Sequence, residues 1–527
     1  MTAPTVPSLP VHAEVFARAL DARDARFDGV FFVGITTTGI YCRPVCPARV
    51  SYRSHRRFFH SAAAAERAGY RPCMRCRPEL APGRALIDAV PRLARAAAHR
   101  IAAGALNGRS VAELARDLGV SARHLRRALE REIGVSPLEL AQTHRLLLAK
   151  RLLADTGLAV TRVAYASGFQ SLRRFNAAFR EQYRMAPSAV RRPPHAPAGE
   201  RARMAEDAPL QLSLAYRAPF AWGALLGFLR GDAIDGVEIV DGRRYGRTIQ
   251  LEGRSGFVIV EDAAVRVDRD RPHIPVRAPT ALARRPAPTQ VAHVDVAVSP
   301  SLVPAFMPLL ARLRQLFDLD AEPTMIDAHL AQGGLGGLVA RRPGIRIPGA
   351  MDGFDVALRA LLRGRARTSR AGRSSGDPAR RVTWALGEPI ETGIPGLSRL
   401  VPSAARMADA GSARLEALGI PRHRAFAAVA MARLVADGVL RLEPGSDVAA
   451  TRRILTEITG VGDQSATTIV MRALYWPDAL SITDRALQRA AGVSTPGALH
   501  ALAERWRPWR AYAALHLWLD DGQDIAL

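Results

Sequence analysis

The sequence predicts a multidomain α+β protein with three units that follow one another along the chain. Its 527 residues, 48% of them hydrophobic, can supply several cores, because domains of about 100–200 residues are typical. The four cysteines are confined to residues 42–76, and residues 85–190 show helical periodicity. Strand-like alternation from about residue 212 gives way to helices after about residue 304. These patterns predict a small cysteine-bearing module, an all-α region and a larger α+β unit.

Positive charge is concentrated in the first part of the chain. The net charge of +25 divides into +17 for residues 1–200 and +8 for residues 201–527, and arginine supplies nearly all of it. A basic face attracts the phosphates of DNA. A soluble, arginine-rich surface without a nucleic-acid partner is the alternative. Charge alone does not decide between them, so the motifs must.

The first residues do not resemble a targeting segment. Residues 1–20 include Pro7, Pro10, Glu14 and Arg18, so they lack the apolar core of a signal peptide. No stretch reaches the roughly 18 apolar residues of a membrane span. We therefore expect a cytoplasmic protein with no membrane association. In a reducing compartment, clustered cysteines favour metal ligation over disulfides.

The cysteine spacing predicts a metal site. Cys42 and Cys46 are separated by three residues, Cys73 and Cys76 by two, and 26 residues lie between the pairs. Two close thiolate pairs can complete a tetrahedral site for one Zn²⁺. A purely structural zinc that staples a small domain is the commoner use of four cysteines.

The residues around the cysteines favour a chemical role. Residues 36–46, TTTGIYCRPVC, and residues 69–76, GYRPCMRC, resemble the N-terminal domain of the Ada-type adaptive-response proteins. The resemblance implies that Cys42 is both zinc ligand and acceptor of a methyl group from DNA methylphosphotriesters. That transfer is irreversible and stoichiometric. It also implies that Cys46, Cys73 and Cys76 are the other ligands, and that four residues hold the DNA backbone, namely Thr38, Arg49, Arg71 and Arg75.

The helical region contains two similar helix-turn-helix patterns. Residues 110–121 predict an amphipathic helix, a glycine-containing turn and a serine N-cap, and a second copy begins at Val163. The pair ends near Pro187 and resembles the AraC-type DNA-binding domain. The implied recognition residues are Arg123, His124, Arg126, Arg127, Arg173, Arg174 and Asn176. A helical bundle with merely solvated arginines is the alternative.

The last unit contains a helix-hairpin-helix pattern, LTEITGVG at residues 455–462, with Asp484 twenty-two residues after its last glycine. This order resembles the AlkA-type 3-methyladenine DNA glycosylase II family, from about residue 212 to residue 521. The resemblance implies that Gly460 and Gly462 approach a DNA phosphate, while Phe228 and Trp518 surround the flipped base. Asp484 would stabilise an oxocarbenium-like transition state. An aspartate that only caps a helix is the alternative.

Two stretches depart from the family pattern. Residues 266–285 carry six arginines and residues 363–383 carry seven, and neither has the pattern of a core segment. Gln464 stands where bifunctional glycosylases place their Schiff-base lysine, so we expect a monofunctional, hydrolytic enzyme without a cofactor. The alternative is a methylation-switched transcription factor whose glycosylase-like domain binds DNA but is catalytically inactive.

Together the motifs predict a regulator and enzyme of DNA alkylation repair. The predicted division is a zinc methyl-acceptor domain (1–84), a helix-turn-helix domain (85–192), a linker (193–210), an AlkA-type α+β subdomain (211–335) and a helix-hairpin-helix glycosylase domain (336–527). The expected partners are alkylated and promoter double-stranded DNA, with RNA polymerase during activation. We expect a monomer.

Overall fold

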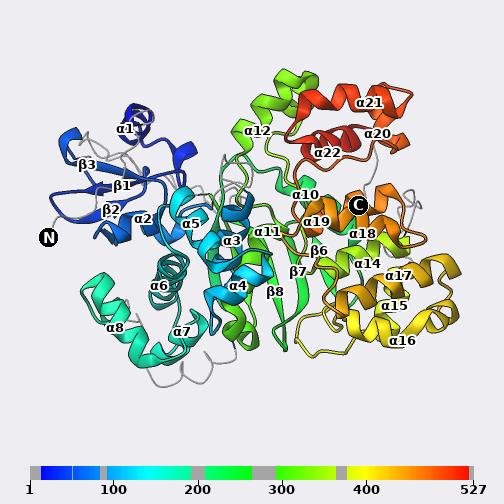
Figure 1. Cartoon of the computed structure of the whole chain (residues 1–527), viewed down its shortest axis with the longest axis horizontal. Coiled ribbons are helices and arrows are strands. Elements are labelled where there is room, and N and C mark those ends of the chain that lie inside the picture. Colours follow the sequence, from blue (N-terminus) through cyan, green and yellow to red (C-terminus); the bar gives the residue numbers. More distant parts are fainter. Residues whose placement is uncertain are drawn as a thin grey trace, which may run out of the picture.

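The computed structural model describes residues 13–49, 51–83, 92–190, 208–263, 292–363 and 377–521. Figure 1 shows the N-terminal module beside the cyan helices, a central sheet, and helices beyond it on the side away from the module. Most of the predicted linker and all of the 266–285 stretch lie outside the described residues.

Residues 13–83, the N-terminal module, form a small sheet with helices beside it. The strand order is β3-β1-β2-β4, in which β2 and β4 run parallel and the other neighbours antiparallel. Phe16 stacks on the buried Phe31 at a ring-centroid distance of 4.4 Å. The elements are α1 (Ala13–Asp21), η1 (Ala25–Phe27), β1 (Phe32–Ile35), β2 (Ile40–Cys42), η2 (Arg53–His55), β3 (Arg56–Phe59), α2 (Ala62–Arg67), β4 (Arg71–Pro72) and η3 (Pro78–Leu80).

The next region is helical, as its periodicity predicts. Serine side chains cap the helices that follow Ser110, Ser121, Ser136 and Ser171, each accepting a backbone N–H of the first turn. These caps fix where the helices begin. The elements are α3 (Arg92–Ala102), α4 (Val111–Asp117), α5 (Ala122–Glu132), α6 (Pro137–Asp155), α7 (Val160–Ala166), α8 (Leu172–Tyr183) and η4 (Pro187–Val190).

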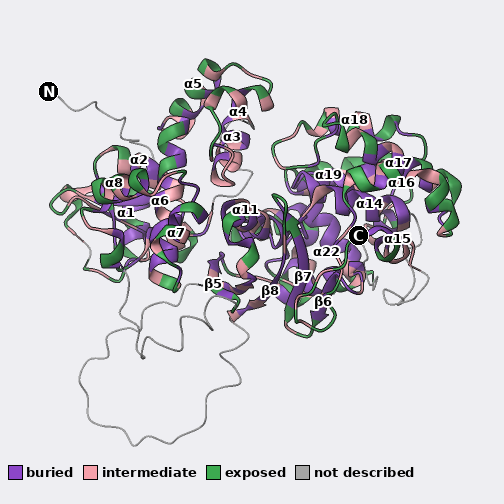
Figure 2. Cartoon of the chain, turned by 90° about the horizontal axis from the view of Figure 1, so that it is seen from below, coloured by how far each residue is buried: buried purple, intermediate pink, exposed green. Residues whose placement is uncertain are grey.

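A five-stranded antiparallel sheet follows, in the order β5-β9-β8-β7-β6. Its first strand, β5, begins at Leu210, close to where strand-like alternation is predicted to start. Side chains of the sheet, α10, α11 and the second half of the helical region share one buried cluster, so these parts pack as a continuous body (Figure 2). The elements are β5 (Leu210–Ala215), α10 (Trp222–Asp232), β6 (Glu238–Asp241), β7 (Arg244–Leu251), β8 (Arg254–Asp262), β9 (His293–Val298), η6 (Pro300–Ala305) and α11 (Phe306–Leu316).

The remaining residues form helices around a second large cluster. They are α12 (Pro323–Leu330), the π-helical turn η7 (Ala331–Leu335), α13 (Gly336–Arg341), α14 (Gly353–Arg363), α15 (Pro378–Leu386), α16 (Ala404–Ala417), α17 (Arg422–Ala436), α18 (Val448–Glu457), α19 (Asp463–Ala473), α20 (Arg485–Ala490), α21 (Pro496–Ala503), η8 (Glu504–Trp506) and α22 (Arg510–Asp520).

Part of the 363–383 stretch does belong to the core, contrary to expectation. Asp377 caps α15, and Val382 on that helix is fully buried. Arg363 ends α14 and forms ion pairs with Asp232 and Asp377. This packing could not be recognised from the arginine-rich sequence, because the ion-pair partners of Arg363 lie elsewhere in the chain. Among the described residues, no helix has both the length and the apolar character needed to cross a bilayer.

Candidate functional site

The strand pairing of the N-terminal module brings the four cysteines together. Tyr41 on β2 pairs with Pro72 on the parallel strand β4, so Cys42 and Cys73 lie side by side where these strands end. Cys46 follows on a turn, in which its backbone N–H donates a hydrogen bond to the carbonyl of Arg43 at 3.2 Å. All four sulfur atoms lie within 4.8 Å of one another.

This donor set fits a zinc ion. Zn–S bonds of about 2.3 Å in a tetrahedron place the sulfur atoms about 3.8 Å apart, and the sulfur atoms of the cluster lie within 4.8 Å of one another. Hydrogen bonds with the neighbouring thiols raise the pKa of Cys42 and lower that of Cys73, so the four thiols cannot ionise independently. A divalent cation removes this conflict by holding all four as thiolates. The donor chemistry and spacing thus support the zinc cofactor.

Backbone and buried charges shape the turn around the cluster. The N–H of Arg43 reaches the Cys76 sulfur and the N–H of Arg75 reaches the Cys73 sulfur, both at 3.4 Å. The Arg43 guanidinium is buried, pairs with Asp28 and donates to the Cys76 carbonyl at 3.0 Å. These contacts come from residues that are not metal ligands, and they fix the positions of the cysteine side chains.

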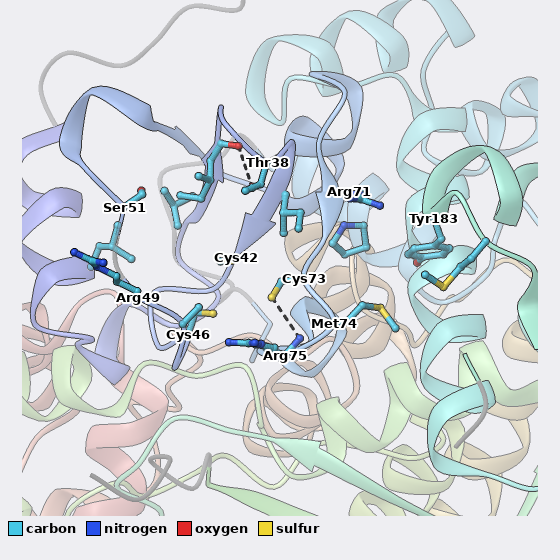
Figure 3. Close-up of a pocket in the computed structure, with 17 residues that line it drawn as sticks. Thr38, Cys42, Cys46, Arg49, Ser51, Arg71, Cys73, Met74, Arg75 and Tyr183 are labelled. Carbon is cyan, nitrogen blue, oxygen red and sulfur yellow. Dashed lines mark hydrogen bonds between the residues drawn. The ribbon is translucent and has the colours of Figure 1, made fainter. Parts of the chain in front are cut away.

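Cys42 differs from the other three cysteines in exposure. Cys46, Cys73 and Cys76 are buried, whereas Cys42 is only partly buried and lines a cavity of about 430 Å³. Figure 3 shows Cys42, Cys46 and Cys73 in this cavity among residues from β2, β4 and neighbouring loops. The same cavity is lined by the four residues expected to hold the DNA backbone, Thr38, Arg49, Arg71 and Arg75, all of them exposed. The site therefore offers one accessible cysteine sulfur beneath a basic rim.

Lys150 supports this site from helix α6, and the motif reasoning missed it. Its ammonium donates to the Cys73 carbonyl at 3.2 Å and pairs with Glu79 at 2.7 Å, while both side chains are 1% exposed. It is the only lysine in the chain, a compositional signal that could have singled it out. An ammonium is a compact charge, which suits a buried position between a carbonyl and a carboxylate. Lys150 thus couples the metal centre to the helix-turn-helix region.

Replacing Lys150 by methionine should weaken both stability and zinc binding. Glu79 would lose a buried partner and, among the described residues, would keep its ion pair with Arg77 at 3.0 Å. We expect a loss of about 3 kcal/mol of unfolding free energy and about tenfold weaker zinc binding, measured by denaturant titration and chelator competition. The double variant Lys150→Met/Glu79→Leu should recover part of the stability. An equally unstable double variant would show that the unpaired carboxylate is not the cause.

Glu66 forms a second polar contact between the module and α6. It accepts hydrogen bonds from the hydroxyls of Tyr41 at 2.9 Å and Thr143 at 2.6 Å. Burial raises the pKa of Glu66 to about 7, although both hydrogen bonds and Lys150 act to lower it. The folded protein therefore holds this carboxyl protonated at pH values where the unfolded chain has released its proton.

Stability should consequently fall as pH rises from about 4.5 to about 7, because the folded state binds more protons there. Glu66 alone accounts for about 3 kcal/mol over this window. Glu66→Gln should remove that part of the slope, measured by denaturant unfolding at pH 5 and pH 8. Glu130→Gln on α5, an exposed position, controls for the lost charge. A Glu66→Gln protein with the original slope would contradict the assignment.

The two helix-turn-helix units have the predicted arrangement. Helix α4 precedes α5 and α7 precedes α8, with Gly119 and Gly168 at positive φ in the two turns, a conformation that glycine adopts without strain. Of the expected recognition residues, six are exposed and Asn176 is partly buried. The exposed six are Arg123, His124, Arg126 and Arg127 on α5, and Arg173 and Arg174 on α8.

Asp484 lies in a cavity of about 380 Å³ in the C-terminal helices. It is 3% exposed and caps α20, with Oδ1 accepting the N–H groups of Ala486 at 2.9 Å and Leu487 at 3.2 Å. Its Oδ2 accepts a hydrogen bond from the Gln464 amide at 3.3 Å. Helix capping therefore accounts for Oδ1 only. Oδ2 instead contacts Gln464, which also lines the cavity.

The hairpin glycines line the same cavity. Gly460 has φ +96°, and a Cβ there would lie 3.0 Å from the carbonyl oxygen of His423, so another residue would be strained and crowded. Gly462 precedes α19 and offers no capping side chain, which leaves amides suited to a phosphate. The carboxylate of Asp463 at this helix start pairs with Arg452 and accepts a hydrogen bond from Ser481 at 3.0 Å.

The two aromatic residues expected around a flipped base are placed differently. Trp518 on α22 lines the cavity beside Asp484. Phe228 on α10 is 4% exposed and belongs to the hydrophobic cluster instead of the cavity lining. The rest of the cavity wall mixes polar and apolar side chains, with Gln464, Ser481 and Thr483 among the polar ones.

Three family profiles match successive parts of the chain. The metal binding domain of Ada matches residues 16–79 and a helix-turn-helix domain matches residues 114–193. The AlkA N-terminal domain matches residues 211–352. These matches confirm the resemblances and the fold class inferred from the motifs.

Curated relatives extend the match to nearly the whole chain. The chain is 34% identical over 506 residues to the probable bifunctional transcriptional activator/DNA repair enzyme AlkA of Mycobacterium tuberculosis (strain H37Rv), covering 95% of each. DNA-3-methyladenine glycosylase 2 of Escherichia coli is 29% identical over 310 residues, covering 59% of this chain and 97% of the enzyme. The bifunctional transcriptional activator/DNA repair enzyme Ada of Escherichia coli is 33% identical over 149 residues, covering 28% and 40%. The chain belongs to the family of bifunctional transcriptional activator/DNA repair enzymes that join an Ada-type metal-binding domain, a helix-turn-helix domain and an AlkA-type domain.

Proposed function

We propose that the N-terminal module removes methyl groups from DNA methylphosphotriesters onto Cys42. The observation that carries this is the partial exposure of Cys42 alone among four clustered cysteines, in a cavity rimmed by Arg49, Arg71 and Arg75. The Cys42 sulfur attacks the methyl carbon, the carbon–oxygen bond breaks, and its electron pair leaves on the phosphodiester oxygen. A bound Zn²⁺ would keep the sulfur deprotonated at neutral pH. The product is a methyl thioether, so each chain acts once.

The charge of the site gives the reaction a regulatory consequence. Four thiolates around Zn²⁺ sum to −2, and methylation of Cys42 leaves −1. The weaker repulsion from DNA should tighten binding. The exposed residues of α5 and α8 would then read promoter DNA in the major groove. We propose that the protein activates transcription as a cytoplasmic monomer in contact with RNA polymerase.

The C-terminal helices provide the second proposed activity, hydrolytic excision of 3-methyladenine and related alkylated purines. Asp484 and Trp518 line one cavity with both hairpin glycines, which supports a carboxylate acting beside a flipped base. With Gln464 at the start of α19, this site would be monofunctional. The proposed domain limits remain those drawn from the sequence, with divisions at residues 84, 192, 210 and 335.

A mass measurement tests the first activity. The zinc-loaded protein is incubated with DNA carrying one methylphosphotriester, with unmodified DNA as control. The expected result is the mass gain of one methyl group per chain, located on Cys42 by peptide mapping. No gain, or a methyl group on another residue, would overturn the proposal. Release of 3-methyladenine from alkylated DNA by the same protein tests the second activity.

A further inference from the structure

Helix α17 carries an exposed aromatic side chain between cations, close to the Asp484 cavity. Phe426 is 55% exposed and is the one exposed phenylalanine among the described residues. Arg422, four residues earlier, and Arg433, seven residues later, lie on the same helix face, because such spacings correspond to about one and two turns. Both are exposed, as is His423. We refer to Arg422, His423, Phe426 and Arg433 as the α17 stripe.

The start of this helix is fixed against the catalytic side of the domain. His423 and Arg424 line the Asp484 cavity, and the His423 carbonyl lies against Gly460 of the hairpin. The Arg424 guanidinium donates to the carbonyls of Leu362 and Arg363 at 3.0 and 3.2 Å, which anchors α17 to the end of α14. The α17 stripe therefore begins at the edge of the cavity and adjoins the phosphate-binding turn.

Among the ion pairs of the described residues, none uses the charges of the stripe. Among the described residues, no carboxylate forms an ion pair with Arg422 or Arg433, although most buried arginines of this domain are paired. The opposite face of α17 is packed, with Ala425, Ala428 and Met431 buried. Unpaired cations flanking an exposed ring match a partner that offers both negative charge and flat apolar surface, and a nucleic acid offers both.

We propose that the α17 stripe is a DNA contact beside the lesion, in which Arg422 and Arg433 bind phosphates and Phe426 stacks on a base exposed by extrusion of its neighbour. This rests on the proposed excision function only in assuming that damaged DNA approaches the Asp484 cavity. A protein partner or a second copy of the chain would need a larger apolar area than one ring among cations supplies.

The test compares Phe426→Ala with Val439→Ala in the full-length, zinc-loaded protein. Val439 lies just beyond α17 and is 60% exposed, so it matches Phe426 in accessibility, and the unfolding free energy of both variants is measured alongside. The probe is a duplex with one reduced abasic site, which mimics an extruded nucleotide. Binding is measured by anisotropy, and unstacking by the fluorescence of 2-aminopurine placed beside that site.

We expect Phe426→Ala to bind the probe about tenfold more weakly and to lose most of the 2-aminopurine signal, while Val439→Ala matches the unsubstituted protein. Arg422→Ala should reduce the slope of the logarithm of the binding constant against the logarithm of salt concentration by about 1, the amount expected for one lost phosphate contact. Equal affinity and fluorescence for Phe426→Ala would overturn the inference, as would a change in oligomeric mass with unchanged DNA binding. If base release is absent but the Phe426 effect is present, the proposed excision fails while this inference stands.

Discussion

Cys42→Ala is expected to abolish methyl uptake from methylphosphotriester DNA, from one methyl group per chain to none. Cys42 is the only partly exposed sulfur of the cluster, and the three remaining thiolates are buried beneath it. The variant should also lose the tightening of DNA binding after exposure to damaged DNA, because no change in site charge can occur. Intact-protein mass spectrometry and DNA-binding titrations before and after exposure provide the measurements.

Two controls separate chemistry from folding in this experiment. Zinc content and unfolding free energy of Cys42→Ala establish whether the three-cysteine site still holds its metal. Met74→Ala removes another exposed sulfur that lines the same cavity, 47% exposed, and should accept a methyl group normally. Full methyl uptake by Cys42→Ala, or none by Met74→Ala, would place the acceptor elsewhere.

Asp484→Asn should reduce the single-turnover rate of base excision by about 100-fold or more, the loss typical of removing one charge-stabilising group. Asparagine caps helices as well as aspartate does, so the contacts with Ala486 and Leu487 should persist. The unfolding free energy should change by less than about 0.5 kcal/mol. The rate is measured on DNA with a single alkylated purine, with enzyme in excess.

The matched control is Asp447→Asn. Asp447 caps α18 through the N–H of Ala450 at 2.8 Å and lies outside the cavity lining, so its substitution makes the same chemical change at a distance. Excision by Asp447→Asn should equal that of the unsubstituted protein. An Asp484→Asn enzyme that excises normally would remove Asp484 from the reaction. An unsubstituted protein that excises nothing would favour the catalytically inactive, DNA-binding alternative.

The features that could be predicted from the sequence are those that depend on residues close together in the chain. Serine caps and glycine turns mark the helix-turn-helix units, and paired cysteines mark the metal centre, because each depends on residues a few positions apart. The cavity around Cys42 also gathers Thr38, Arg49, Arg71 and Arg75 as expected. Their roles in DNA contact stay predictions until the DNA-bound protein is measured.

Long-range partners could not be predicted in the same way. Lys150 contacts the carbonyl of Cys73, seventy-seven residues away in sequence, and no local pattern specifies such a pair. The 363–383 stretch was expected outside the core for a related reason, since Arg363 is matched by Asp232, which is 131 residues distant. Phe228 was expected around the flipped base only because of the family resemblance, without support from the neighbouring residues. It lies in the hydrophobic cluster instead of the cavity lining.

The near-absence of lysine bears on the fate of the DNA once a base has been removed. Excision leaves an abasic sugar whose ring-opened form is an aldehyde, and aldehydes condense with amines to form Schiff bases. The side-chain amine of Lys150 is buried and engaged, while the other 73 cationic side chains are guanidinium groups, which stay protonated. If the C-terminal helices excise a base as proposed, the arginine side chains that hold the damaged strand would therefore not become covalently trapped on the abasic product.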